Sequence, residues 1–381
     1  MSKLKVMIVF GTRPEAIKMA PVITQFLKDS SHFETIVAVT GQHRQMLDQV
    51  LHLFKITPDI DLAIMKDQQS LNQILSAVLI RMEDVIAQRK PDLVLVQGDT
   101  TSAFAAALCA FHHKIAVGHV EAGLRTRDKY NPFPEEINRK LIAPLADFHF
   151  APTPKAKENL LREGVPEDKI HVTGNTGIDA LKMVVRSDYR FNQDAISDID
   201  FKRKKVITLT THRRESFGAP MRDIFKAVKQ VVAIHPDVEV VFPVHLNPQV
   251  RLMVQEEIVG HARIHLIDPL DYEPFVHLLN NSYLILTDSG GIQEEAPALG
   301  KPVLVLRETT ERMEGITVGT ARLVGTNPDR IIAETSRLLE DDVAYKAMAS
   351  VANPYGDGHA AERIIEIIQK EMGGRPCEQN K

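Results

Sequence analysis

The sequence predicts an α/β protein with two doubly wound parallel sheets, and three observations lead to this expectation. Short apolar runs, such as LVLV at 93–96, alternate with longer amphipathic segments, as in the βαβ units of parallel sheets buried on both faces. A polar stretch at 186–205 interrupts the alternation, which then starts again. At 381 residues, of which 44% are hydrophobic and 25% charged, the chain can form two globular domains.

The expected elements follow from these patterns in chain order. Strands of the first half are expected at 5–10, 35–40, 93–97, 115–120 and 148–151, with helices at 70–89 and 101–113. Strands of the second half are expected at 206–211, 238–243, 264–267, 284–287 and 302–306. We therefore expect one domain over 1–185 and another over 205–355, with a last helix at about 360–372 that could pack on either.

Charge and cysteine content exclude several classes of protein. The net charge of -4 and the pI near 6.4 give no general attraction to nucleic acid or to an anionic membrane. Cys109 and Cys377 are too few for a disulfide framework. The N-terminal apolar run lacks a cleavage site, and no stretch of about 20 apolar residues follows it. We expect a cytoplasmic protein that binds neither nucleic acid nor membrane.

Ligands of open parallel sheets bind beyond the carboxyl ends of the strands, so the residues after each strand are the candidates. The first strand ends in GTRPE at 11–15, where Gly11 permits a tight turn and Pro14 suits the first turn of a helix. Arg13 and Lys18 then oppose the positive end of the helix dipole, which a bound phosphate would relieve. The alternative is that Arg13 pairs with a carboxylate and Lys18 is solvated. The turn lacks the GxGxxG pattern, so no dinucleotide is indicated.

Three acidic residues should meet at the same sheet edge. Asp99 follows the strand at 93–97 and could cap the next helix or act as an acid or base. Glu121 follows the next strand, and its alternative is a structural ion pair with the arginines that come after it. Glu135 and Glu136 follow a proline-rich loop at a predicted helix start, where at least one of them is expected to serve only the helix dipole.

The second half places cations and glycines at the corresponding positions. His212 and two arginines follow the strand at 206–211. After the strand at 284–287, Ser289, Gly290 and Gly291 could present backbone amides to a pyrophosphate, and a glutamate one turn later could accept both ribose hydroxyls. Arg312 follows the next strand and could meet the phosphates. The alternative is a glycine-rich turn with helix-favouring acids.

Several common motifs are missing from the sequence. We find no HExxH, no paired CxxC, no Walker lysine loop and no GxSxG. Zinc hydrolysis, P-loop ATPase action and serine hydrolysis therefore have no support.

The motifs GTRPE, GDTTSA, HVEAGLRT, PFPEEINR, THRRE and DSGGIQEEAPALGKPVLVLRETTER together resemble the non-hydrolysing UDP-N-acetylglucosamine 2-epimerases of bacteria. The resemblance extends from residue 6 to about 363. It implies the GT-B architecture, with two Rossmann-like domains facing a cleft, and a homodimer. It also implies interconversion of UDP-GlcNAc and UDP-ManNAc without NAD, metal or other cofactor, through elimination and re-addition of UDP. A role in cell-wall or capsule polysaccharide precursors is part of the same inference.

The resemblance also assigns roles to residues of this sequence. Asp99, Glu121 and Glu135 are the acid and base candidates, and His212, with Arg13 and Lys18, would stabilise the departing UDP. The nucleotide would be held by Ser289, Gly290, Gly291, Glu295 and Arg312, with Phe275 near the uracil. Some bacterial members bind a second UDP-GlcNAc as activator, and the matching residues here are Gln42, Gln45 and Glu136. Gln68 and Gln69 stand where such members are expected to carry an arginine.

Three other functions remain alternatives at this point. A hydrolysing 2-epimerase would share the elimination step but release free ManNAc. A GT-B glycosyltransferase would use the same UDP site but need an acceptor, and it predicts no exchange of the C2 hydrogen. A nucleotide-sugar sensor would bind without turnover.

Overall fold

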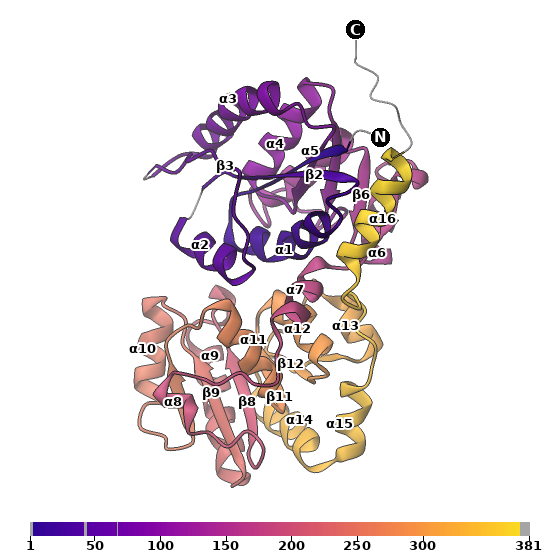
Figure 1. The fold of residues 1–381 in the computed structure, drawn as a ribbon. Helices are drawn as coiled ribbons and strands as arrows, with labels where there is room; N and C mark the ends of the chain where they lie inside the picture. The colour runs from indigo at the N-terminus through magenta and orange to yellow at the C-terminus, as the bar shows by residue number, and fades with distance from the viewer. Residues whose placement is uncertain (1–2, 42–43, 67, 374–381) are drawn as a thin grey trace. The chain divides into compact units, whose positions relative to one another are not determined.

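The computed structural model describes residues 3–41, 44–66 and 68–373, which fold into two compact units (Figure 1). Unit 1 comprises Met1–Met183 and Gly356–Lys381, and unit 2 comprises Val184–Tyr355. Each unit has its own parallel sheet with helices on both faces. The predicted α/β class with two doubly wound parallel sheets is thus confirmed.

Within the described residues, unit 1 contains a seven-stranded sheet in the order β3-β2-β1-β4-β5-β6-β7, and every pair is parallel. The strands are β1 (Leu4–Phe10), β2 (Phe33–Val39), β3 (Ile60–Asp61), β4 (Leu93–Gln97), β5 (Ala116–Val120), β6 (Phe148–Ala151) and β7 (Ile170–Val172). The central strand β1 pairs with β2 on one side and β4 on the other. From β1 the successive strands extend to one side of the sheet, and from β4 they extend to the other. The point between β1 and β4 is therefore the switch point, at which ligands of such sheets bind.

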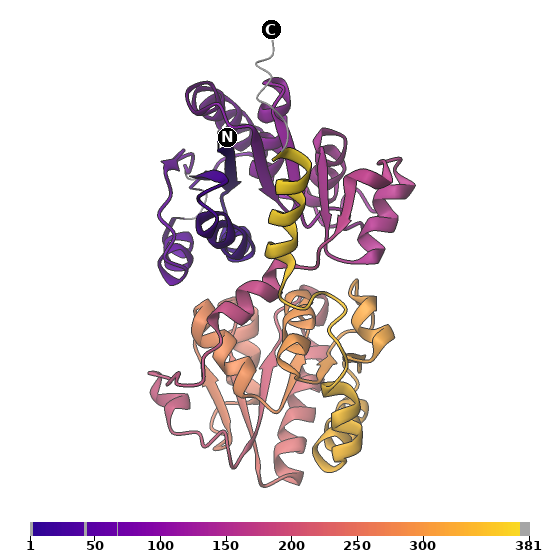
Figure 2. The same ribbon diagram turned by 45° about the vertical axis from the view of Figure 1, so that its right-hand side comes forward.

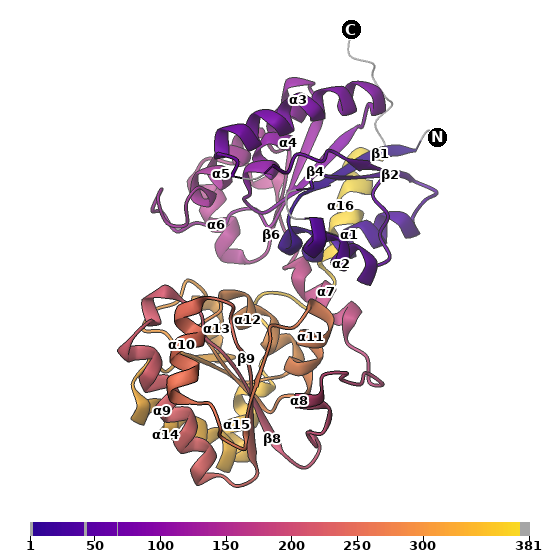
Figure 3. The same ribbon diagram turned by 90° about the vertical axis from the view of Figure 1, so that its left-hand side faces the viewer.

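Alternate residues of β1 belong to separate cores, which explains its unbroken apolar sequence. Val6, Ile8 and Phe10 pack under α1 (Arg13–Lys28), α2 (Arg44–Leu53) and α16 (Ala360–Met372). Met7 and Val9 pack under α3 (Leu71–Arg89) and α4 (Thr101–His112). Figure 3 shows these two groups of helices on opposite faces of the sheet. The two-residue period of a strand buried on both faces produces this division.

The last helix, α16, returns from unit 2 and lies beside α1 in unit 1 (Figure 2). Its buried residues Ile364, Ile365 and Ile368 join the core that contains α1. The sequence left open which domain this helix covers, and the structure places it on the first.

Unit 2 repeats the topology over its own described residues, with a six-stranded parallel sheet in the order β10-β9-β8-β11-β12-β13. The strands are β8 (Lys205–Thr210), β9 (Val238–Pro243), β10 (Ile264–Ile267), β11 (Leu284–Thr287), β12 (Val303–Val305) and β13 (Ala321–Leu323). Here the chain reverses between β8 and β11, so the switch point lies at the ends of these two strands.

Helices also cover both faces of the second sheet. One core includes α9 (Ala219–Ile234), α10 (Pro248–Glu257) and α14 (Pro328–Glu340), and another includes α11 (Tyr272–Asn281), α12 (Gly290–Glu295) and α13 (Met313–Val318). The remaining α-helices are α5 (Glu135–Ile142), α6 (Pro154–Arg162), α7 (Thr176–Val184), α8 (Asp194–Ser197) and α15 (Asp342–Ala349). None of the helices in the described ranges is both long and apolar enough to span a bilayer.

The predicted strands agree with the structure to within two residues at each end. The sequence analysis missed β3, β7 and β13, each of which has two or three residues and lies at a sheet edge. Such strands are too short for a hydrophobic period to be visible. The polar stretch at 186–205 also contains structure, because α8 lies within it and Ile196 and Ile199 pack in a core with residues of β8, β9 and β10.

Candidate active site

The turn after β1 is organised by Glu15, which the sequence analysis did not select. Thr12 caps α1 and forms a capping box with Glu15. The buried Glu15 carboxylate accepts hydrogen bonds from the amides of Gly11 (2.9 Å) and Thr12 (2.7 Å) and from the Thr100 hydroxyl (2.6 Å). It therefore joins the loops at the ends of β1 and β4, the two strands of the switch point.

Gly11 has a different role from the one expected. Its φ is not positive, but a Cβ atom there would lie 2.0 Å from the Thr40 hydroxyl, so glycine is needed for close approach. Arg13 is the first residue of α1 and forms no ion pair within the described part of the chain.

Asp99 does not cap the following helix. The cap of α4 is Thr100, whose side chain accepts from the amide of Ala103. The Asp99 carboxylate instead receives two bonds from Arg139 of α5, from Nε at 2.7 Å and from Nη2 at 2.6 Å. Asn138, also of α5, donates to the Asp99 carbonyl at 2.9 Å. The capping alternative is therefore wrong, and α5 fixes the orientation of this carboxylate.

Glu121 forms an ion pair, but with a different partner from the arginines considered. Lys18 of α1 donates to its Oε2, and Gln97 at the end of β4 donates to the same atom at 3.1 Å. Arg125 pairs with Glu163 instead, with two bonds of 2.7 and 2.8 Å. Lys18 is thus bonded to a carboxylate rather than solvated, and Glu121 lies at the meeting point of three elements.

Of the two adjacent glutamates, Glu136 has the structural role. It is fully buried and accepts the amides of Thr126 and Arg127 at 3.0 Å each, and it also pairs with Arg139 at 3.4 Å. Burial acts to raise the pKa of Glu136, but these amides and the charge of Arg139 outweigh it and lower the pKa below its usual value. Glu136 therefore fixes the loop after β5. Its side chain is buried, so it is not exposed to an effector that arrives from solvent.

Glu135 is the half-buried first residue of α5, and its side chain forms no hydrogen bond or ion pair with any described residue. It lies one helical turn before Arg139, on the same face of the helix. Since Arg139 contacts Asp99, that face is directed toward the end of β4.

His119 links the loops that carry Asp99 and Glu121. Its Nε2 lies 2.7 Å from the Gly98 carbonyl, and the Gly98 amide donates to Val120 at 3.0 Å. Burial lowers the pKa of His119 from 6.5 to about 4, so the ring is neutral and Nε2 donates its proton. Gly98, the residue before Asp99, is therefore bound to β5 through both its amide and its carbonyl.

In unit 2, the turn after β8 is built around Asp288, another residue whose role the sequence analysis missed. Its buried Oδ2 accepts the amides of His212 (2.7 Å) and Arg213 (2.8 Å) and the Thr211 hydroxyl (3.0 Å), while Oδ1 lies 3.1 Å from Nδ1 of His212. Burial acts to raise the pKa of Asp288, but the His212 contact and the two amides lower it overall. Asp288 therefore orients the His212 ring, which also stacks on His245 with centroids 5.4 Å apart.

The turn after β11 has the backbone expected of a phosphate site. Ser289 is the N-cap of α12 but its side chain does not bond the helix, so the first amides of α12 have no side-chain cap. The space beside Gly291 is open, whereas a Cβ atom on Gly290 would lie 3.1 Å from the Glu311 carboxylate. Phe275 is partly buried against the same core as α12. Glu295, the last residue of α12, is also partly buried.

Arg312 is not free beside this turn. Its Nε donates to Glu294 at 2.5 Å, and its Nη1 lies 3.5 Å from Glu311. A phosphate that binds Arg312 would therefore lie close to the carboxylates of Glu294 and Glu311, which already contact this arginine.

Two of the predicted effector residues cannot be placed. Gln42 lies outside the described residues, as does the side chain of Gln45.

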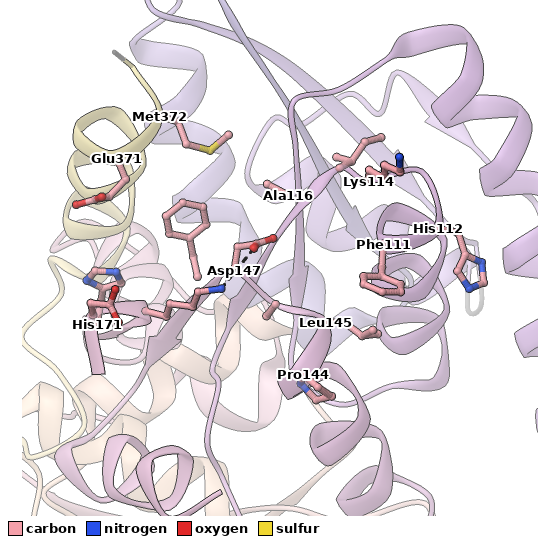
Figure 4. Close-up of a pocket in the computed structure, with 15 residues that line it drawn as sticks. Phe111, His112, Lys114, Ala116, Pro144, Leu145, Asp147, His171, Glu371 and Met372 are labelled. Carbon is pink, nitrogen blue, oxygen red and sulfur yellow. Dashed lines mark ion pairs between the residues drawn. The ribbon is translucent and has the colours of Figure 1, made fainter. Parts of the chain in front are cut away.

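A cavity of about 900 Å³ lies elsewhere in unit 1 (Figure 4). It is lined at the amino ends of β5 and β6 by Ala116 and Phe148, with Asp147 and Lys169 paired at 3.7 Å beside them. None of the predicted site residues is among the residues that line this cavity. In the described ranges, no group of three His, Cys, Asp or Glu side chains is arranged to hold a metal ion.

The sequence is similar to that of known proteins over nearly its whole length. The sequence model of the family described as UDP-N-acetylglucosamine 2-epimerase matches residues 25–369. The UDP-N-acetylglucosamine 2-epimerase of Bacillus subtilis (strain 168) is 53% identical over 375 residues, covering 98% of this chain and 97% of the relative.

Two solved structures have the same fold. A crystal structure described as a putative UDP-N-acetylglucosamine 2-epimerase from Listeria monocytogenes gives a TM-score of 0.93 at 50% identity, with 100% of both chains covered. The UDP-GlcNAc 2-epimerase from Neisseria meningitidis, solved bound to UDP-GlcNAc, gives 0.83 at 48% identity, with 96% of this chain and 100% of that one covered.

The two doubly wound units give the chain an α/β fold. Together with the similarity to UDP-N-acetylglucosamine 2-epimerases, this fold defines the protein as an α/β isomerase. The chain belongs to the UDP-N-acetylglucosamine 2-epimerase family.

Proposed function

We propose that the enzyme interconverts UDP-GlcNAc and UDP-ManNAc by eliminating UDP and adding it back. The observation that carries this proposal is the pair of acids beyond β4 and β5, where Arg139 orients Asp99 and Lys18 and Gln97 hold Glu121. The names of its relatives and the UDP-GlcNAc bound in the Neisseria enzyme support the substrate.

The chemistry of C2 favours elimination. The C2 hydrogen lies beside an N-acetyl group and is not α to a carbonyl, so a base alone cannot remove it readily. In the proposed reaction a carboxylate takes the C2 proton as the C1–O bond breaks, and the electron pair of that bond leaves on the β-phosphate oxygen. The products are UDP and 2-acetamidoglucal. Return of a proton to the opposite face of C2, with re-formation of the C1–O bond, gives the epimer.

We assign the proton transfers to unit 1. Asp99, Glu121 and Glu135 are the candidate acids and bases, and two of them are needed because the proton leaves one face and returns to the other. Arg13, which has no ion pair among the described residues, is assigned to the charge that develops on the pyrophosphate.

We assign the nucleotide to unit 2. The uncapped amides of α12 would bind the diphosphate together with Arg312, and His212, oriented by Asp288, would donate to a phosphate oxygen. Glu295 would accept the ribose hydroxyls and Phe275 would contact the uracil. Neither the elimination nor this binding scheme requires NAD or a metal ion.

Incubation with UDP-GlcNAc in deuterium oxide, without NAD, metal or acceptor, tests the proposal directly. We expect NMR to show deuterium entering at C2 and a lasting mixture of UDP-GlcNAc and UDP-ManNAc. Deuterium enters because the proton that returns to C2 comes from a group in exchange with solvent.

Each alternative predicts a different product. Free ManNAc with UDP would mean that water consumes the intermediate, as in a hydrolysing epimerase. The absence of any exchange at C2 would rule out proton removal and leave a transferase or a sensor.

A further inference from the structure

One carboxylate of unit 2 lies among three arginines beside the start of α12. Oε2 of Glu311 lies 2.8 Å from Nη1 of Arg307, and its Oε1 lies 3.5 Å from Arg312 and 3.7 Å from Arg213. The arginines come from the loops after β8 and β12. The Glu311 carboxylate therefore contacts arginines from two different loops.

The Glu311 carboxylate lies beside the first residue of α12. A Cβ atom on Gly290, the first residue of α12, would lie 3.1 Å from Glu311 Oε1 and 3.6 Å from the Arg312 guanidinium carbon. The side chain of Ser289, the N-cap residue, makes no cap bond to this helix. A carboxylate and a guanidinium thus lie directly over the turn that we assign to the diphosphate.

Two of the three arginines also pair with another carboxylate. Arg307 also bonds Glu215 at 2.8 Å, and Arg312 bonds Glu294 at 2.5 Å. Removing the charge of Glu311 would therefore leave both cations paired while reducing the negative charge at the turn.

Glu311 remains ionised under ordinary conditions. Burial acts to raise the pKa of Glu311, but a backbone hydrogen bond and the charges of Arg312 and Arg307 outweigh it and hold the pKa below its usual value. The group is about one-third exposed, so it has room to move when another anion arrives.

We propose that Glu311 is an internal anion that competes with the diphosphate of the nucleotide for Arg312, Arg213 and the start of α12. Its carboxylate already contacts Arg312, which we assign to the diphosphate, so a bound diphosphate has to displace it or accept its repulsion. Glu311 thereby weakens UDP binding and speeds UDP release. This inference depends on the proposed function, since it takes UDP as the ligand of this turn.

Calorimetric titration of the full-length protein with UDP and with uridine tests the competition. Glu311→Gln keeps the size of the side chain and removes its charge, so we expect UDP to bind at least about fivefold more tightly, because like charges in contact oppose binding. Uridine has no phosphate and should bind both proteins equally. Glu215→Gln is the matched control, since Glu215 pairs with Arg307 only, and should change UDP affinity less than twofold.

Glu311→Met provides a second uncharged side chain of similar length, and thermal melting checks that each variant is folded. Tighter UDP binding in the folded variants, with uridine unchanged, supports the proposal. Equal or weaker UDP binding would overturn it and make Glu311 a group that merely positions the arginines. If the wild-type protein binds uridine but not UDP, or neither, the proposed function itself fails.

Discussion

The carboxylate of Glu121 is fixed by groups from two other elements of unit 1. Lys18 reaches it from α1 and Gln97 from the end of β4. The backbone of Glu121 has φ of 67°, in the left-handed region that residues other than glycine rarely adopt. Such conformations cluster at functional sites, where the surrounding structure maintains them. This geometry supports a chemical role for Glu121 beyond that of an ion pair.

Neutralising either acid at the ends of β4 and β5 should remove most of the activity. We expect Asp99→Asn and Glu121→Gln each to lower turnover at least ~100-fold, the usual scale for the loss of a general acid or base. Turnover is measured by NMR as the rate of appearance of UDP-ManNAc, and UDP should still bind, because neither Asp99 nor Glu121 is among its proposed contacts.

Glu163→Gln is the control for this pair. Glu163 bonds the neighbouring Arg125, on the loop after β5, but lies on the surface of the unit. Its activity should remain within about twofold of wild type, because Glu163 is not among the proposed acids and bases. Near-normal turnover in both acid variants would refute their assignment.

At the scale of elements, α16 stabilises unit 1 although it is the last helix of the chain. Its buried residues join the core formed by α1 and one face of the sheet. Because α1 carries both Arg13 and Lys18, the packing of α16 also supports the helix that delivers these cations.

Shortening a buried side chain of α16 should destabilise unit 1. Ile368 is fully buried, so Ile368→Ala is expected to lower the free energy of unfolding by about 2–5 kcal/mol through lost burial and the cavity left behind. Urea unfolding followed by circular dichroism measures the effect. Glu366→Ala, on the exposed face of the same helix, should change it by less than about 0.5 kcal/mol. Equal effects of the two substitutions would show that α16 is not packed as described.

At the scale of the whole molecule, two buried histidines link stability to pH. His119 and His149 pair across β5 and β6, and burial lowers their pKa values from 6.5 to about 4 and about 3. Both are neutral in the folded chain, whereas the unfolded chain binds their protons at higher pH. The folded state is therefore fully favoured above about pH 6.5 and loses stability as the pH falls toward 4.

We expect the free energy of unfolding to fall between pH 7 and pH 4.5, measured by urea unfolding at each pH. The lowering of the pKa of His119 from 6.5 to about 4 corresponds to about 3 kcal/mol of stability once this pH range is fully crossed. His119→Gln retains an amide donor for the Gly98 carbonyl but cannot titrate, so its stability should fall less steeply. A variant as steep as wild type would show that His119 does not contribute to the pH dependence.

Much of the fold follows from local features of the sequence. Strands such as β4 and β11 are short apolar runs bounded by glycine and polar residues, and they were predicted without error. Residues that directly follow such strands must lie at the carboxyl edge of the sheet, so Asp99, Glu121 and His212 could be selected as candidates. Asp288 also follows a strand directly, and that position was the signal that could have identified it.

The sequence alone determined the two βαβ series, their strands and the set of residues at the strand ends, because these depend on neighbours along the chain. Only the tertiary structure decided which of those residues are partners. Lys18 bonds Glu121 across 103 positions and Arg139 bonds Asp99 across 40, and no periodicity relates such distant residues. Their pairing depends on strand order and on how each helix packs, which the burial of the whole core selects.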